Sequence, residues 1–367
     1  MLPFTVNLRS LFCCLVVVSL TRLSAAPAPF RLAVVGLDHG HVDTFLADAL
    51  ARKDVQVVGV VESKPALAAD YARRLKLAPD IQFSNLEQML TSAKPDAVAI
   101  FTSTFAHAEV VEACAAHGVP VMMEKPLAVS MEHAHRIERA ARDHHIRVIV
   151  NYETTWFPSN KAAYDLTRDQ SIGPIRKVVV RSGHQGPKEI GCPPAFLTWL
   201  TDPKLNGGGA LTDFGCYGAD LITWLMDGQR PTRVTAVTQQ LKPDVYPQVD
   251  DDATIILTYP RAQGIIQASW NWPIGRKDMD IFGVSGQIQV ADRSRLLLRK
   301  SGGQAQTIEP PALEANYREP LGYLIAVVRG EITEHPLSTL ATNLIVTEIL
   351  DAARESAATH RSIELVP

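Results

Sequence analysis

Short apolar runs separated by amphipathic segments fill the first part of the chain after residue 30. The runs of strand length cover residues 31–36, 55–62, 96–102, 119–124 and 147–152. Between the first two runs, Val42, Phe45, Leu46 and Ala49 recur at helical spacing. Continuous apolar strands that alternate with helices form parallel sheets covered on both faces. We therefore expect a doubly wound parallel sheet, of α/β class, over residues 30–150.

The pattern changes after residue 152, where strand-like segments follow one another closely. Examples are IRKVVVRSG, TRVTAVTQQL, ATIILTYP and GIIQASWNW, and turn residues such as Gly264 and Gly286 separate them. This succession predicts an α+β domain with a mostly antiparallel sheet that has one covered and one open face. We expect it to span residues 151–367 and to serve substrate binding and oligomerisation. Its C-terminal helix, residues 338–360, should pack back on the body.

The first 28 residues differ from the rest of the chain. Arg9 precedes an apolar run over residues 11–20, and the small residues of SAA and APA follow it, which is the pattern of a signal peptidase site. The run is shorter than the roughly 20 residues that span a bilayer, so we expect a cleaved signal peptide rather than an anchor. No Arg-Arg pair precedes the apolar run, so the sequence gives no support to the twin-arginine export route. We therefore expect a secreted or periplasmic protein with no membrane partner after cleavage.

The composition excludes several classes of function. The 367 residues suffice for two domains with cores of their own, and the net charge of −3 includes no basic block. We therefore expect neither nucleic acid nor an anionic membrane surface as a partner. Beyond the signal peptide, Cys114, Cys192 and Cys216 lack metal-type spacing, so we expect neither a disulfide framework nor a zinc site.

The first predicted strand ends in GLDHGH, at the place where a dinucleotide-binding Rossmann fold has G-x-G-x-x-G. Only Gly36 is in register with this fingerprint. Asp38 stands at the second glycine position and His41 at the third, while Gly40 is displaced by one residue. All of these residues, with His39, are candidates for cofactor binding.

The turn has two interpretations. Asp38 either caps the helix that follows or lies near the cofactor pyrophosphate, which its charge would repel. In the second case the imidazoles of His39 and His41 would offset that charge or bond the phosphates directly. We expect no metal site on these histidines, because the neighbouring sequence offers no third ligand.

Polar residues at the ends of the next strands extend the predicted cofactor site. Glu62 closes the second strand 26 residues after Gly36, where an acidic residue binds ribose hydroxyls and repels a 2′-phosphate, which favours NAD over NADP. Thr102, Ser103 and His107 follow the next strand. In the alternative interpretation, Glu62 is a solvated carboxylate at a strand end and His107 only opens its helix.

The tripeptide Glu124-Lys125-Pro126 directly follows an apolar strand, which places its charges at the crevice. A lysine there can hydrogen-bond a reacting hydroxyl and lower its pKa. Further on, GGGALTDFGCYGAD places Asp213 and Tyr217 four residues apart, on one face of a predicted helix. A carboxylate and a phenol can bind vicinal hydroxyls and move one proton. A surface turn and an incidental polar pair are the alternatives.

These motifs together resemble the glucose–fructose oxidoreductase/inositol dehydrogenase/MocA (Gfo/Idh/MocA) family over essentially the whole mature chain. The resemblance implies that Lys125 is catalytic and that Asp213 binds substrate. It also assigns proton exchange to Tyr217, because tyrosine replaces the usual histidine in the glucose–fructose oxidoreductase and dihydrodiol dehydrogenase branches. A homo-oligomer is implied as well.

Two departures from the family pattern concern the pocket. Asp38 and His41 break the glycine fingerprint, and residues 151–158 lack the arginine often found there. We expect Trp156 to line the nicotinamide or substrate pocket instead. His184 or Trp199 would help Asp213 to bind a substrate hydroxyl.

The sequence thus predicts an exported NAD(P)-dependent oxidoreductase that transfers hydride to or from a sugar, cyclitol or sugar-derived hydroxyl or carbonyl, with NAD as cofactor and no metal. One alternative is an NAD-dependent glycosidase that uses transient oxidation, although the intact Lys125 argues against it. The other is an exported carbohydrate-binding protein without cofactor.

Overall fold

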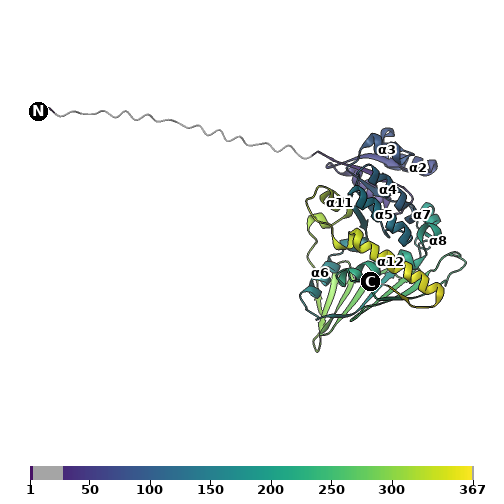
Figure 1. Ribbon diagram of the computed structural model, residues 1–367, viewed down its shortest axis with the longest axis vertical. Coiled ribbons are helices and arrows are strands. Elements are labelled where there is room, and N and C mark those ends of the chain that lie inside the picture. Colours follow the sequence, from purple (N-terminus) through teal and green to yellow (C-terminus); the bar gives the residue numbers. More distant parts are fainter. Residues whose placement is uncertain (3–27, 366–367) are drawn as a thin grey trace.

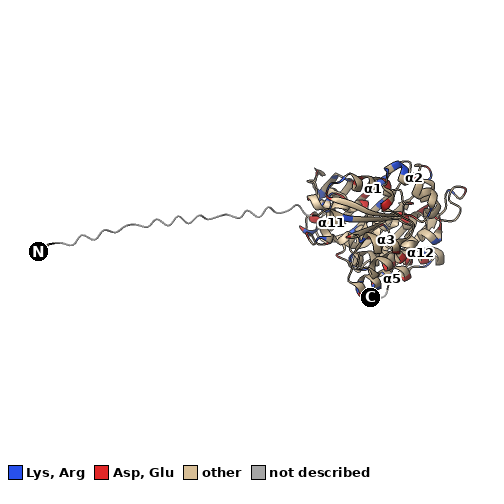
Figure 2. Cartoon of the chain, turned by 90° about the horizontal axis from the view of Figure 1, so that it is seen from above, with Lys and Arg blue, Asp and Glu red and all other residues tan. Residues whose placement is uncertain are grey.

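The computed structural model describes residues 1–2 and 28–365 (Figure 1). Most of the expected signal peptide, including its apolar run, lies outside these residues. In the described part of the chain, no helix has both the length and the apolar character needed to cross a membrane. Basic and acidic residues are interspersed over the elements (Figure 2), in keeping with the small net charge.

The first part of the described chain forms a six-stranded sheet whose neighbouring strands all pair in parallel. In the order β3-β2-β1-β4-β5-β6, the strands are β3 (Gln82–Phe83), β2 (Val55–Val61), β1 (Phe30–Val35), β4 (Ala97–Ile100), β5 (Val121–Glu124) and β6 (Val148–Asn151). The order reverses between β1 and β4, and ligands bind at the strand carboxyl ends beside such a switch point. The predicted doubly wound parallel sheet is confirmed.

Five helices accompany this sheet: α1 (Val42–Ala51), α2 (Pro65–Leu75), α3 (Leu86–Ala93), α4 (His107–Ala116) and α5 (Met131–His144). Side-chain caps define where two of them begin. The Asn85 side chain accepts the Gln88 N–H at the start of α3, and Ser130 accepts the His133 N–H at the start of α5. Strands β4, β5 and β6 are buried along their whole length, as their continuous apolar sequences predict.

The rest of the chain forms a nine-stranded sheet in the order β14-β13-β12-β11-β7-β10-β9-β8-β15. The strands are β7 (Ile175–Gly183), β8 (Arg233–Gln239), β9 (Asp252–Thr258), β10 (Gln263–Ser269), β11 (Arg276–Gly283), β12 (Gly286–Asp292), β13 (Arg295–Lys300), β14 (Gln306–Ile308) and β15 (Ile363–Glu364). Only β7 and β10 pair in parallel among the described strands of this sheet. The predicted, mostly antiparallel sheet is therefore confirmed.

Helices lie against one side of the nine-stranded sheet (Figure 1). These and the neighbouring helices are α6 (Pro158–Arg168), α7 (Pro194–Leu200), α8 (Pro203–Asn206), α9 (Ala210–Asp213), α10 (Gly215–Leu225), α11 (Pro320–Val328) and α12 (Leu340–Thr359). Helix α10 is buried throughout and packs on β7 and β10. Along β7 and β10, buried residues alternate with half-buried ones on the uncovered face.

Helix α12 connects the two sheets. It packs on strand β8 of the second sheet, on helix α10, which covers that sheet, and on helix α5, which accompanies the first sheet. The Asp351 carboxylate accepts the Met131 N–H at 2.6 Å, and the Tyr152 hydroxyl donates to Asn343 at 3.0 Å. These buried and half-buried contacts fix the carboxyl edge of the parallel sheet against the second sheet, and the candidate site lies at that junction.

Candidate active site

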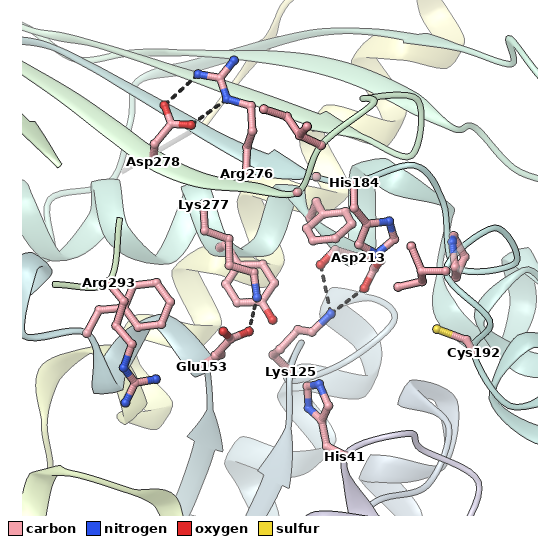
Figure 3. Close-up of a pocket in the computed structure, with 18 of the residues that line it drawn as sticks. His41, Lys125, Glu153, His184, Cys192, Asp213, Arg276, Lys277, Asp278 and Arg293 are labelled. Carbon is pink, nitrogen blue, oxygen red and sulfur yellow. Dashed lines mark hydrogen bonds and ion pairs between the residues drawn. The ribbon is translucent and has the colours of Figure 1, made fainter. Parts of the chain in front are cut away.

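A cavity of about 630 Å³ lies where the carboxyl edge of the parallel sheet meets α10 and β11 (Figure 3). His41 and Lys125 line it from the first sheet, and Asp213, Tyr217 and Lys277 line it from the second part of the chain. The cavity thus unites all three predicted catalytic residues, which come from segments far apart in the sequence.

Lys125 and Asp213 form a buried ion pair. The Lys125 Nζ lies 2.5 Å from Asp213 Oδ1 and also donates to the Asp213 carbonyl oxygen at 3.0 Å, while the side chains are 7% and 8% exposed. Burial opposes both charges, but the attraction outweighs it. The Asp213 carboxylate raises the pKa of Lys125 well above its usual value, and the Lys125 ammonium lowers the pKa of Asp213. Both groups are therefore charged at neutral pH.

Trp270 completes the surroundings of Asp213. Its indole Nε1 donates to Asp213 Oδ2 at 2.9 Å, and the tryptophan is fully buried. Trp270 is not among the residues predicted from the sequence, although its place directly after the apolar strand β10 is a signal for a residue at a sheet edge. Asp213, predicted to bind a substrate hydroxyl, is thus already bonded to Lys125 and Trp270, so it also positions the lysine.

Tyr217 projects into the same cavity and is 2% exposed. The Lys125 Nζ lies 5.1 Å from the centroid of its ring, and the Lys277 Nζ lies 4.6 Å from that centroid. Burial raises the pKa of Tyr217 to about 12, against the opposing influence of the two ammonium groups. At neutral pH the phenol is therefore protonated and can donate a proton.

The predicted single helical face for Asp213 and Tyr217 is wrong in detail. Helix α9 ends at Asp213 and α10 begins at Gly215, so Phe214 interrupts the helix between them. Both side chains nevertheless line the one cavity. The interruption lets the Asp213 carbonyl oxygen accept from Lys125, which a continuous helix would have used for its own hydrogen bonds.

In the turn between β1 and α1, one of the two glycines is required by the backbone and the other is not. Gly36 has φ +84°, and a Cβ there would lie 2.6 Å from the Thr102 side chain, so this glycine is required. At Gly40 the nearest atom to such a Cβ, in Pro193, is 4.0 Å away. The displaced Gly40 is therefore not needed for the turn.

Asp38 does not cap α1, because the helix begins after His41 without any side-chain cap. Its carboxylate instead pairs with the Lys64 ammonium at 2.6 Å. The negative charge that would repel a pyrophosphate is thus offset by a lysine rather than by His39 and His41, contrary to our expectation. The sequence offered no signal for this partner, which lies just beyond β2.

Glu62 is buried at the end of β2 and binds the turn. Its carboxylate accepts the Leu37 N–H at 2.9 Å and the Lys64 N–H at 2.8 Å. Because a carboxylate oxygen accepts more than one hydrogen bond, Glu62 can still receive ribose hydroxyls. The tight turn at Gly36, the neutralised Asp38 and this carboxylate together fit a dinucleotide at the switch point of the sheet.

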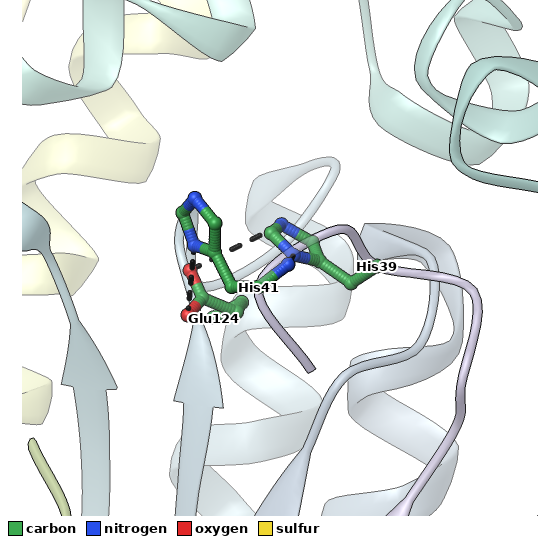
Figure 4. A group of neighbouring side chains, drawn as sticks. All are labelled: His39, His41 and Glu124. Atoms are coloured by element: carbon green, nitrogen blue, oxygen red, sulfur yellow. Dashed lines mark hydrogen bonds and ion pairs between the residues drawn. The ribbon is translucent and has the colours of Figure 1, made fainter. Parts of the chain in front are cut away.

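His39, His41 and Glu124 form a cluster beside this turn (Figure 4). The His41 Nδ1 lies 3.3 Å from Glu124 Oε1, the His39 Nε2 lies 4.0 Å from Glu124 Oε2, and the Asn151 amide donates to Glu124 at 2.9 Å. Although burial opposes its charge, the two histidines hold the pKa of Glu124 at about 2. The expectation that no third ligand lies near the histidines was therefore wrong.

The hydrogen bonds nevertheless disfavour a metal in this cluster. The His39 Nδ1 accepts the His41 N–H at 3.1 Å, which leaves the ring proton on Nε2, toward Glu124. A metal at Nε2 would have to displace that proton, whereas metal-bound histidines donate from their other nitrogen. The cluster is better described as a carboxylate that faces N–H donors.

Three other predicted residues lie at the end of β4 but differ in exposure. Thr102 and Ser103 are half-buried at the crevice. His107 is 1% exposed, and its Nδ1 lies 3.2 Å from the Leu127 carbonyl oxygen. Burial lowers the pKa of His107 to about 4. This histidine supports the turn that follows Lys125, and its contact with the cofactor stays a prediction.

Of the three predicted substrate contacts, only His184 lines the cavity. Trp156 is buried, donates to Asn151 at 3.0 Å, and borders a second cavity of about 850 Å³ that also contacts Glu124. Trp199 donates to the Asp38 carbonyl oxygen at 3.3 Å and packs on His39. Both tryptophans shape the turn and the strand ends rather than the cavity around Tyr217.

Comparison with known proteins finds a matching family and similar folds. Residues 30–152 match the model described as "Oxidoreductase family, NAD-binding Rossmann fold", and residues 160–289 match the GFO/IDH/MocA C-terminal domain. The trans-1,2-dihydrobenzene-1,2-diol dehydrogenase of Sus scrofa is 24% identical over 320 residues, which is 84% of this chain and 90% of the relative.

Two solved structures share the fold. The aldose-aldose oxidoreductase of Caulobacter crescentus, complexed with glycerol, has a TM-score of 0.78 and 21% identity over 92% of this chain and 100% of its own. An inositol dehydrogenase homolog of Azotobacter vinelandii, complexed with NAD+, has a TM-score of 0.79 and 18% identity over 92% and 98%.

Proposed function

This chain belongs to the Gfo/Idh/MocA family of NAD-binding oxidoreductases, and from that premise we propose that it transfers hydride reversibly between NAD and a hydroxyl-bearing carbon of a sugar-like vicinal diol. The observation that supports this most directly is the convergence of Lys125, Asp213 and Tyr217 in one cavity at the carboxyl edge of the parallel sheet. The names of the relatives, a diol dehydrogenase and an aldose oxidoreductase, point to the same substrate class.

The residues of the cavity divide the proton chemistry among them. In reduction, hydride adds to the substrate carbonyl carbon and the protonated Tyr217 hydroxyl donates its proton to the substrate oxygen, which leaves Tyr217 as a phenolate. Oxidation reverses both transfers, so it requires the Tyr217 phenolate to accept the hydroxyl proton as the substrate C–H bond breaks. Lys125, kept charged by Asp213, stabilises the negative charge that develops on the substrate oxygen. The bound dinucleotide supplies the hydride acceptor or donor.

Glu62 supports NAD rather than NADP as this dinucleotide. Its buried carboxylate ends β2, where a 2′-phosphate would meet like charge. The turn from Gly36 to His41, with Glu124 beside it, would bind the rest of the cofactor. Denaturing the purified chain from residue 29 onward and identifying any released dinucleotide tests this assignment, since stoichiometric NADP(H) would contradict it.

Turnover of polyols and trans-diols with added dinucleotide tests the reaction itself. We expect Tyr217→Phe and Lys125→Met each to lower kcat by about 10²–10⁴-fold. The first removes the group that exchanges the substrate proton, and the second removes the charge that stabilises the substrate oxygen. Tyr259→Phe is the matched control, since Tyr259 is also buried but lies outside the cavity and its hydroxyl has no partner within residues 28–365. Unchanged kcat in Tyr217→Phe would overturn the proposed mechanism.

We also propose that the chain is exported with a cleaved signal peptide, on the basis of the basic residue, the short apolar run and the small residues in its first 28 positions. Fusing residues 1–40 to an alkaline phosphatase that is active only outside the cytoplasm tests this. Activity should require the apolar run, and an Arg substituted for Val17 should abolish it. An inactive fusion that retains all 40 residues would refute export.

A further inference from the structure

A second lysine, which the sequence analysis did not single out, faces Tyr217. Lys277 lies on β11, and its Nζ is 4.6 Å from the centroid of the Tyr217 ring, closer than the Nζ of Lys125. The two lysines enter the cavity from opposite sides (Figure 3). The Lys277 side chain is 22% exposed, so its ammonium group lies where solvent screening of charges is reduced.

Glu153 fixes the position of this ammonium. The two side chains form an ion pair, and Glu153 begins the short helix η3 (Glu153–Trp156) directly beyond β6 of the parallel sheet. The pair therefore joins the carboxyl edge of one sheet to a strand of the other, across the junction that contains the cavity. Burial opposes the charge of Lys277, but attraction to Tyr217 and to Glu153 outweighs it and raises the pKa of Lys277.

The charges around the phenol act in opposite directions. Burial disfavours the ionised phenol, Lys277 and Lys125 favour it, and Glu153 disfavours it. An ammonium over a neutral ring contributes only a modest cation–π attraction. Once the phenol loses its proton, the same ammonium faces a full negative charge in a poorly solvated site, and the attraction is much stronger. Lys277 therefore discriminates between the two protonation states that the reaction requires.

We propose that Lys277 is a positioning residue for catalysis, which stabilises the phenolate of Tyr217 from the side opposite Lys125 and is itself oriented by Glu153. The inference rests on the proposed function, in which the Tyr217 oxygen gains the substrate hydroxyl proton in oxidation and returns it in reduction. Lys277 acts through the phenol, whereas Lys125 acts on the substrate oxygen.

Titration of the phenol tests this proposal without cofactor or substrate. Replacing Tyr217 by 3,5-difluorotyrosine, whose phenol is more acidic, brings the titration into a range where the chain stays folded, and ¹⁹F NMR follows it. Lys277→Met should raise the midpoint by about one pH unit, and Lys277→Arg should leave it near that of the parent chain. An unchanged midpoint in Lys277→Met would overturn the proposal.

Two further variants separate a charge effect from local disruption. Glu153→Gln removes a negative charge near the phenol, while the Gln amide oxygen can still accept from Lys277 and keep it in place. It should therefore lower the midpoint, opposite to Lys277→Met, whereas loosening of the cavity would move both midpoints in one direction. Lys161→Met is the matched control, because Lys161 also pairs with a carboxylate, that of Asp165, but lies outside the cavity. Its midpoint should equal that of the parent chain.

Steady-state kinetics then distinguish this inference from the proposed function. In Lys277→Met, kcat of diol oxidation should fall, and the rise of kcat with pH should occur at higher pH than in the parent chain. KM should change little, and Lys277→Arg should restore both kcat and its pH dependence. If the parent chain oxidises no diol, the proposed function fails and the role of Lys277 in catalysis fails with it. If the parent is active and the profile of Lys277→Met does not move, only the role of Lys277 is refuted.

Discussion

The ion pair of Lys125 and Asp213 shows how single residues set the chemistry of the cavity. Two charges buried to this extent are costly to desolvate, and only their mutual attraction and the hydrogen bond from Trp270 offset that cost. The pKa of Asp213 lies below its ordinary value of 3.8, so its stabilising contribution is present above that pH and is lost as the pH falls through the lower, folded-state value.

We predict that Asp213→Asn destabilises the chain by about 3–5 kcal/mol, because it leaves the Lys125 ammonium buried without a counter-charge. Lys125→Met in the same chain should recover part of that loss, since no unpaired charge then remains. Urea unfolding of both single variants and the double variant measures this coupling. Strictly additive losses would contradict a buried ion pair.

Asp220 is a second buried acid, and it has no such partner. It is fully buried on α10, and no donor within residues 28–365 bonds either carboxyl oxygen. Burial raises its pKa well above 3.8, so the folded chain retains a proton that the unfolded chain releases. Stability must therefore fall as the pH rises from about 3.8 toward the folded-state pKa.

We predict that Asp220→Asn removes this dependence. The variant should unfold at higher urea concentration than the parent chain at pH 7.5, and its advantage should shrink toward pH 4. Unfolding midpoints measured across that range give the test. An advantage that does not change with pH would mean that Asp220 is not protonated in the folded chain.

At the scale of elements, the turn between β1 and α1 is decided by backbone geometry rather than by its glycine count. Gly36 is the one fingerprint position kept, and it combines φ +84° with close contact to Thr102. Asp38 and His41 occupy the other two positions because Lys64 and Glu124 compensate their charges.

We predict that Gly36→Ala destabilises the chain by about 2 kcal/mol or more, because it adds both a strained φ and a steric clash. Gly40→Ala, the matched control in the same turn, should cost less than about 0.5 kcal/mol, since the nearest atom leaves room for a methyl group. Thermal unfolding of the two variants tests this. Equal losses would show that the turn differs from the structure described.

The elements that sequence patterns missed are those without a periodic signal. Helix α11 is buried on nearly all sides, with Leu321 and residues 323–327 in the core, so no polar stripe marks it. Strand β3 has two residues, too few for an alternating pattern. Strands β7, β8, β9 and β10, by contrast, have alternating apolar positions and were predicted.

At the scale of the whole molecule, the uncovered face of the second sheet carries apolar side chains in register. Ile265 pairs with Ile256 on β9 and with Val179 on β7, and all three are half-buried, whereas their neighbours Ile266, Ile255 and Val180 lie beneath the helices. This arrangement supports the proposal of a homo-oligomer associated through that face.

We predict that Ile265→Asp lowers the molar mass in solution toward that of a monomer, because it places a charge between the apolar side chains of Ile256 and Val179 on that face. Light scattering coupled to size exclusion measures this directly. Leu50→Asp, a comparable change at an exposed position on α1, should leave the mass unchanged. A parent chain that is already monomeric would refute association.

By itself, the sequence determined the fold class, the family and the identity of Lys125, Asp213 and Tyr217 as candidates, because periodicity and short motifs are local properties that a single chain displays. Only the tertiary structure decided which groups surround them. Asp213 bonds Lys125 across 88 positions. Lys277 and Glu153 line the cavity from two other segments, and Trp270 bonds Asp213 from a third. Such contacts depend on how the two sheets pack, and the energies of buried charges depend on those contacts. The same packing places Trp199 outside this cavity and Trp156 at the neighbouring cavity beside Glu124, since the groups they bond lie on loops and strands that the linear sequence does not place.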